Sequence, residues 1–144
     1  MDVHPLVIHY PIAFLSTYAV FELLRFRKLL ALPYWFHIKA TLAVIGELGA
    51  LATVIAAYMS ADLAGESALA DIYKNFIIIT TVIFGIISLA YLKWPEMLRP
   101  VVIIPLAVIG LFFIVVSGGF FGAIVYGTHF DPLLAPIFKL LKVY

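Results

Sequence analysis

The sequence predicts an all-α integral membrane protein, a four-helix transmembrane bundle with a short C-terminal interfacial helix. Of its 144 residues, 65% are hydrophobic and only 12% are charged, and the mean hydropathy is +1.16. These values exclude an ordinary soluble domain. The charged residues cluster between four apolar runs, each long enough to cross about 30 Å of hydrocarbon as a helix. Backbone groups in lipid must be satisfied within the chain, so runs of this length are expected to be helical.

A single membrane domain is expected over residues 1–144. Its spans cover about residues 5–24, 34–61, 71–92 and 101–126. The apolar stretch at about 133–143 contains two lysines and is too short to span, which favours an interfacial helix; a tail bound by a partner is the alternative. No cleavable signal peptide is evident, because the first residues lack a basic segment. The absence of cysteine excludes disulfides, thiolate metal sites and c-type haem attachment.

Lysine and arginine are distributed unevenly between the loops. The loops after the first and third spans carry Arg25, Arg27, Lys28, Lys93 and Arg99, whereas loop 62–67 carries none. Basic loops usually face the cytoplasm. We therefore expect a multi-pass protein of the cell (cytoplasmic) membrane with both termini extracytoplasmic. Trp35 and Trp94 are then expected at the cytoplasmic interface, as aromatic belt residues.

The N-terminal segment contains two prolines close to two histidines. Pro5 fits the first turn of a helix, but Pro11 leaves the carbonyl of Val7 without its usual helical partner. The segment is therefore expected to bend, or the regular helix begins only at Pro11.

The predicted topology gathers His4, His9 and His129 on one membrane face. Ionisable groups at membrane depth face protein, cofactor or water rather than lipid. Three interpretations remain open: a b-type haem, a zinc or copper site completed by Asp62 or Glu66, and packed or headgroup-level histidines without a cofactor. His4 and His9 lie about 140° apart around a helix, so one of them with His129 is the more natural haem pair.

A haem between helices also needs a slot lined by small residues, and two spans supply them. Close packing of helices is the alternative interpretation of such residues. The small residues are Ala43, Gly46, Gly49, Ala50 and Ala56 in the second span, and Ser117, Gly118, Gly119, Gly122 and Ala123 in the fourth.

Glu47 lies about 15 Å into the second span, near the bilayer centre. Burial disfavours the carboxylate, so we expect Glu47 to be neutral, turned into the bundle and hydrogen-bonded to a neighbouring helix. A proton or quinol site at Glu47 is the alternative. Glu22 and Lys39 lie at similar depths and are expected to form an ion pair.

The first residues resemble a known family motif. His4-Pro5-Leu6-Val7-Ile8-His9-Tyr10-Pro11-Ile12-Ala13 is similar to the N-terminal HPxxVHFPIA motif of small four-helix prokaryotic membrane proteins grouped as domain of unknown function 2231. In that family the last helix ends in a glycine-rich run closed by a tyrosine and often a histidine. The run from Ser117 to His129 looks similar, so the resemblance covers essentially the whole chain to His129.

The resemblance implies redox work near the outer membrane face. Relatives are sometimes joined to Rieske or c-type cytochrome domains, and their histidines are suspected haem ligands. Family members usually carry a histidine at the start of the third helix. This chain departs from the family there, with Asp71-Ile72-Tyr73-Lys74. Tyr73 could replace that histidine, His129 could pair instead, or haem could be absent.

We therefore expect a cytochrome b-like membrane subunit of a respiratory or other electron-transfer complex, and not an enzyme. It would bind one haem b near the outer face, with His9 and His129 as iron ligands and His4 or Tyr73 as substitutes. Its partners would be membrane lipid and other membrane and extracytoplasmic redox subunits, with no nucleic acid. A cofactor-free membrane anchor or scaffold of such a complex is the alternative. Transport is disfavoured, because no charged pathway crosses all four spans.

Overall fold

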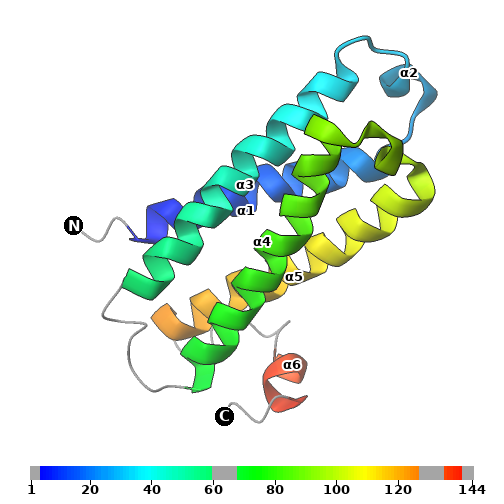
Figure 1. Cartoon of the computed structure of the whole chain (residues 1–144). Helices are drawn as coiled ribbons and strands as arrows, with labels where there is room; N and C mark the ends of the chain where they lie inside the picture. Colours follow the sequence, from blue (N-terminus) through cyan, green and yellow to red (C-terminus); the bar gives the residue numbers. More distant parts are fainter. Residues whose placement is uncertain (1–3, 60–67, 127–134, 141–144) are drawn as a thin grey trace.

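The computed structural model describes residues 4–59, 68–126 and 135–140, which are helical apart from short connections and include no strand (Figure 1). The predicted all-α class is therefore confirmed for this part of the chain. In order, the helices are α1 (His4–Leu23), α2 (Arg27–Leu30), α3 (Trp35–Met59), α4 (Ala68–Lys93), the 3-10 turn η2 (Pro95–Leu98), α5 (Pro100–Tyr126) and α6 (Ala135–Leu140).

The four long helices run alternately up and down and form a closed ring (Figure 1). Helix α1 packs on α3, α3 on α4, α4 on α5, and α5 on α1. The turns α2 and η2 lie at one end of the ring, here called the basic end because Arg25 and Lys93 lie there. The opposite end, where α1 begins at His4, is called the histidine end. Helix α6 lies at this end, with Ile137 packed against the apolar core.

Three of the described helices are long and apolar enough to cross a membrane: α3, α4 and the Pro100–Ile124 portion of α5. Their outward faces carry large apolar side chains, and Leu48, Ile55 and Val101 are 61%, 60% and 84% exposed. A contiguous apolar surface of this extent is unsuited to water and suits lipid. The chain is therefore a multi-pass membrane protein in contact with lipid.

The interior has two apolar clusters, one towards each end of the ring. The cluster at the histidine end includes Tyr73 and Phe120, and the cluster at the basic end includes Tyr18 and Phe84. Glycine allows close approach between helices in the second cluster: a Cβ on Gly110 would lie 2.7 Å from the Phe84 ring. The bundle is therefore held by interlocking large and small side chains.

For the first helix the sequence left two possibilities, a bend near Pro11 or a regular helix that begins only at Pro11. Helix α1 begins at His4 and continues through Pro11, so a regular helix that starts only at Pro11 is wrong. Pro11 is buried, and a Cβ on Gly49 would lie 3.3 Å from its ring. The close contact with α3 holds the helical path here, although Val7 lacks its usual partner.

The predicted spans at about 34–61, 71–92 and 101–126 can be set beside the helices Trp35–Met59, Ala68–Lys93 and Pro100–Tyr126, with residues 60–67 outside the described part. A short helix lies near the C-terminus. There the helix covers Ala135–Leu140, and the rest of the predicted 133–143 segment lies outside the described residues. Trp35 and Trp94, predicted as aromatic belt residues at the cytoplasmic interface, both lie at the basic end but differ in exposure. Trp35 is 8% exposed and stacks on Phe21 at 5.0 Å between ring centroids, whereas Trp94 is 53% exposed.

Candidate functional site

The predicted histidine cluster is only partly visible. His9 is exposed on α1 near the histidine end. His4 is the first residue of α1, but its side chain is not among those described, and His129 lies outside the described residues. Asp62 and Glu66, the candidate additional metal ligands, also lie outside. Within the described ranges, no three histidine or carboxylate side chains form a group that could hold a metal ion.

Tyr73, the predicted substitute ligand, lies inside the bundle. Its side chain is 1% exposed, and its ring centroid is 5.9 Å from that of Phe121 on α5. It shares a cavity with Ile8 of α1, whereas the adjacent His9 is exposed and is not among the residues that line that cavity.

The small residues proposed for a haem slot face packed side chains. A Cβ on Gly46 would lie 2.5 Å from Leu15, one on Gly49 would lie 2.9 Å from Tyr10, and one on Gly118 would lie 3.5 Å from Ile12. All three positions thus receive a side chain of α1. Close helix packing is therefore the interpretation that fits these three glycines.

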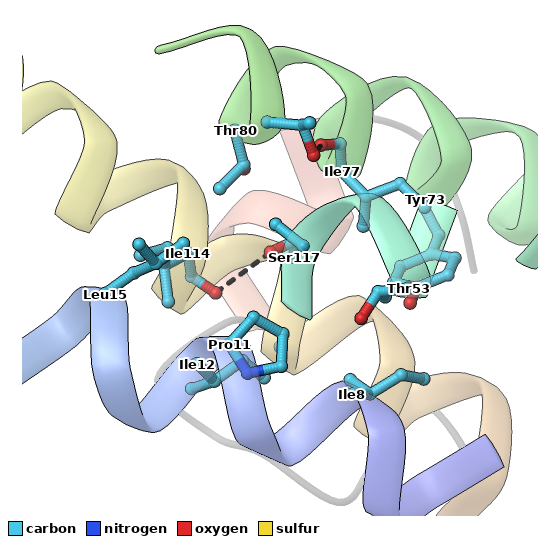
Figure 2. Close-up of a pocket in the computed structure, with 13 residues that line it drawn as sticks. Ile8, Pro11, Ile12, Leu15, Thr53, Tyr73, Ile77, Thr80, Ile114 and Ser117 are labelled. Carbon is cyan, nitrogen blue, oxygen red and sulfur yellow. Dashed lines mark hydrogen bonds between the residues drawn. The ribbon is translucent and has the colours of Figure 1, made fainter. Parts of the chain in front are cut away.

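A small cavity lies between the two apolar clusters, with walls from all four long helices (Figure 2). Its volume is about 30 Å³. A water molecule needs about 10–15 Å³ of such space, so the cavity can hold one or two waters. The lining residues are Ile8, Pro11, Ile12 and Leu15 on α1, Ala50 and Thr53 on α3, Tyr73, Ile77, Thr80 and Thr81 on α4, and Ile114, Ser117 and Gly118 on α5.

Hydroxyl groups give this cavity a polar component. Thr80 donates to the carbonyl of Phe76 at 2.8 Å. Ser117 donates to the carbonyl of Ile114 at 3.0 Å (Figure 2). A hydroxyl that donates to its own helix can still accept through its oxygen. The Tyr73 hydroxyl is buried without a hydrogen-bond partner among the described residues. The wall of the cavity is therefore mainly apolar, and these hydroxyl groups form its smaller, polar part.

Glu47 faces the interior between α3 and α4, as predicted. It is 8% exposed, and a Cβ on Gly85 of α4 would lie 3.3 Å from its Oε1. Its Oε2 is buried and has no hydrogen-bond partner within the described ranges. The predicted hydrogen bond to a neighbouring helix is therefore not made by this oxygen, and the residue that faces the other oxygen, Gly85, has no side chain to donate.

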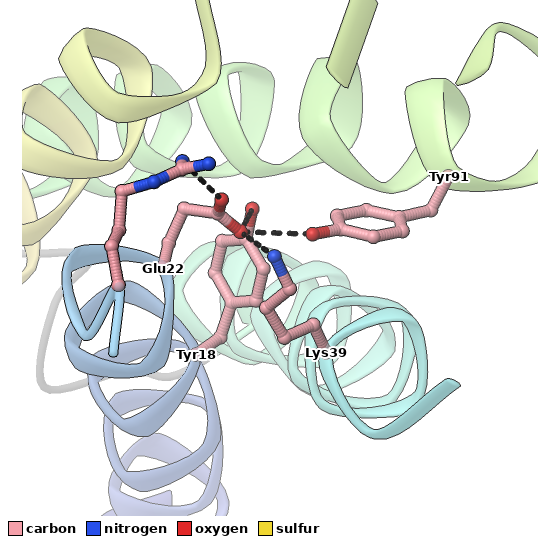
Figure 3. Close-up of polar contacts among 5 residues, drawn as sticks. Tyr18, Glu22, Lys39 and Tyr91 are labelled. Atoms are coloured by element: carbon pink, nitrogen blue, oxygen red, sulfur yellow. Dashed lines mark hydrogen bonds and ion pairs between the residues drawn. The ribbon is translucent and has the colours of Figure 1, made fainter. Parts of the chain in front are cut away.

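Glu22 forms the expected ion pair with Lys39, with Oε2 and Nζ 2.8 Å apart (Figure 3). The same oxygen accepts from the Tyr91 hydroxyl at 2.9 Å and from the Tyr18 hydroxyl at 3.4 Å. Arg25 lies 3.9 Å from the other oxygen. We call these five residues the Glu22 cluster; it joins α1, α3 and α4 near the basic end. Charge-assisted hydrogen bonds of this kind are stronger than neutral ones.

Sequence reasoning missed the two tyrosines of the Glu22 cluster. Tyr18 was detectable, because it lies one turn before Glu22 on the same helix face. Tyr91 is 69 residues from Glu22, and no local pattern connects them. Ser88, another buried hydroxyl without a partner in the described part, was also missed.

Comparisons of this chain with protein-family models, with curated proteins and with solved structures found no match.

Proposed function

We propose that this protein is a small integral membrane subunit of a respiratory or other electron-transfer complex, and that it acts as a cofactor-free anchor or scaffold. The observation that carries the proposal is the packed interior. Gly46, Gly49 and Gly118, which would have lined a haem slot, each face a side chain of α1. The cavity that remains, at about 30 Å³, is far too small for a porphyrin.

The resemblance of the N-terminal motif to domain of unknown function 2231 supports the electron-transfer context. In this proposal the outward apolar faces of α3, α4 and α5 contact lipid and neighbouring membrane subunits, and the histidine end faces extracytoplasmic redox subunits. The proposal also takes α1 as a fourth span, since α1 has 20 residues and packs on both α3 and α5. About 20 helical residues cross the hydrocarbon core.

An absorption spectrum of the purified protein tests the absence of a cofactor. We expect a colourless preparation from haem-replete cells, with intact helical circular dichroism. A Soret band with a reducible α-band would contradict the scaffold proposal. When the protein is purified in mild detergent, membrane subunits that carry redox cofactors should co-purify with it. Isolation of the chain alone would count against membership of a complex.

Reporter fusions test the proposed topology. A fusion after Lys28 should report a cytoplasmic position, and a fusion after Ser67 should report an extracytoplasmic one, because basic loops are retained inside. A cytoplasmic signal after Ser67 would refute both the four-span arrangement and the external termini.

Haem b at the edge of the bundle is the second candidate, favoured by the exposed position of His9 on α1. Such a haem would lie outside the packed interior, with His9 and His129 as its ligands. His9→Ala and His129→Ala, made singly, should then each abolish or convert a bis-histidine spectrum while the protein still inserts. His37→Ala is the matched control, because His37 is an exposed histidine at the basic end.

A further inference from the structure

Four buried polar side-chain atoms are left without hydrogen-bond partners among the described residues. One is Trp35 Nε1, at the start of α3, and the other three lie inside the ring. They are the Tyr73 hydroxyl, Glu47 Oε2 and Ser88 Oγ, on side chains that are 1%, 8% and 5% exposed. A buried polar group without a partner costs about 1–3 kcal/mol. In folded proteins such groups are usually satisfied by internal water. Three of them in one bundle therefore indicate a hydrated interior.

The Tyr73 and Ser88 atoms belong to one side of α4, and Glu47 of α3 packs against the same side. Thr81 lines the cavity, Gly85 faces Glu47, and Ser88 comes next, at intervals of four and three residues. Residues at this spacing lie on one face of a helix. Each interval rises about 4.5–6 Å along the axis of the helix. We call this line, from Tyr73 through Glu47 to Tyr91, the polar seam.

The polar seam is long enough to cross the hydrocarbon core. Tyr73 and Tyr91 are 18 residues apart on α4, which corresponds to about 27 Å. At the basic end Tyr91 donates to Glu22, and the Glu22 cluster reaches Arg25, whose side chain is 37% exposed. At the other end the water-sized cavity brings together Tyr73 and four further hydroxyl side chains, those of Thr53, Thr80, Thr81 and Ser117.

Glu47 is the one carboxyl near the middle of this line. The titratable side chains along the seam are Tyr18 and Glu22 from α1, Lys39 from α3, and Tyr73 and Tyr91 from α4. The Pro100–Ile124 portion of α5 contains none. Every charged group among them belongs to the Glu22 cluster, so Glu47 faces no opposite charge that would hold it permanently ionised.

We propose that internal waters fill the polar seam and that it carries protons between the cavity at Tyr73 and the Glu22 cluster, with Glu47 as the obligatory relay. In each step the Glu47 carboxyl releases its proton to a water on one side and takes up a proton from a water on the other. One O–H bond breaks and one forms, so the carboxyl returns to its initial state. This inference goes beyond the scaffold function and requires only that the four helices cross the membrane.

Proton flux into vesicles tests the proposal. The full chain is reconstituted into phosphatidylcholine and phosphatidylglycerol vesicles with a trapped pH-sensitive dye, and a potassium gradient with valinomycin drives proton entry. We expect faster acidification than in protein-free vesicles. Glu47→Gln should reduce the rate to that of protein-free vesicles, because an amide cannot relay a proton in this way, and Ser88→Ala and Tyr73→Phe should each slow the flux.

Two matched control variants distinguish loss of the proton relay from a general disturbance of the fold. Glu96→Gln removes an exposed carboxyl at the basic end, and Thr17→Ala removes an exposed hydroxyl that donates to its own helix. Both should conduct like the wild type. The midpoint of unfolding in detergent is measured for each variant, to establish that it is folded before proton flux is compared. If Glu47→Gln does not fold, the slower flux expected of Ser88→Ala is the test of the proposal.

Wild-type vesicles no faster than protein-free ones, or Glu47→Gln vesicles as fast as wild type, would overturn the proposal. The scaffold function is judged separately, by the absorption spectrum and by co-purification, so failure of one leaves the other testable.

Discussion

Glu22 and Glu47 are two buried carboxyls of one helical bundle, and their surroundings differ sharply. Glu22 receives a lysine and two tyrosine hydroxyls from three helices (Figure 3). Glu47 faces a glycine, and its Oε2 has no hydrogen-bond partner in the described part. The surroundings of Glu22 stabilise a charge, whereas those of Glu47 leave a polar group without compensation. Glu22 thus has a structural role that its contacts explain, and Glu47 does not.

Among changes at the two carboxyls, replacement of Lys39 should have the largest effect on the free energy of unfolding. Lys39→Met leaves the Glu22 carboxylate buried without its cation, so we expect a loss of about 3–5 kcal/mol in the free energy of unfolding. Titration with a denaturing detergent in mixed micelles measures the loss. Lys28→Met, at an exposed position on α2, is the matched control and should change little. Equal stability of the two variants would show that Glu22 needs no cation.

Loss of one tyrosine hydroxyl should have a smaller effect. Tyr91→Phe removes a 2.9 Å hydrogen bond to the carboxylate, for which we expect a loss of about 1.5–3 kcal/mol. Tyr18→Phe removes the longer 3.4 Å contact and should cost less in the same titration. The opposite order would mean that Tyr18, and not Tyr91, is the main hydroxyl donor to Glu22.

Replacement of Glu47 should have the smallest effect on stability. The sequence alone predicts that Glu47→Leu would strand a hydrogen-bond partner; the structure shows no partner for Oε2, so we now expect a change within about 1 kcal/mol. Glu47→Gln should be equally mild. The same unfolding titration checks both variants, and a loss as large as that of Lys39→Met would mean that Glu47 has a structural partner after all.

The two carboxyls also show how far sequence reasoning reaches. The pairing of Glu22 with Lys39 followed from their similar depths, because opposite charges in lipid must meet. The burial of Glu47 followed from its position in an apolar run. The absence of a partner for Glu47 did not follow, because Gly85 lies on another helix and only packing brings it opposite Glu47.

The same limit applies to the predicted haem slot. Glycines and alanines on a helix indicate that another group approaches its backbone closely, but the residue types alone do not show whether that group is a porphyrin or a neighbouring side chain. In the structure, Leu15 lies against Gly46 and Ile12 lies against Gly118, contacts that no local pattern in the sequence predicts. Tyr73 was predicted as a substitute haem ligand from its place in the family pattern, whereas its burial beside Phe121 depends on how α4 packs on α5.

The sequence by itself determined the helical class, the ranges of the long helices and their apolar outward faces. These features depend on hydrophobic length and on backbone satisfaction in lipid, which are local properties of each segment. Only the tertiary structure decided which polar groups meet, that Tyr91 reaches Glu22 across 69 residues, and that a water-sized cavity lies beside Tyr73. Such contacts depend on the rotation and register of one helix against another, and side-chain packing alone sets these.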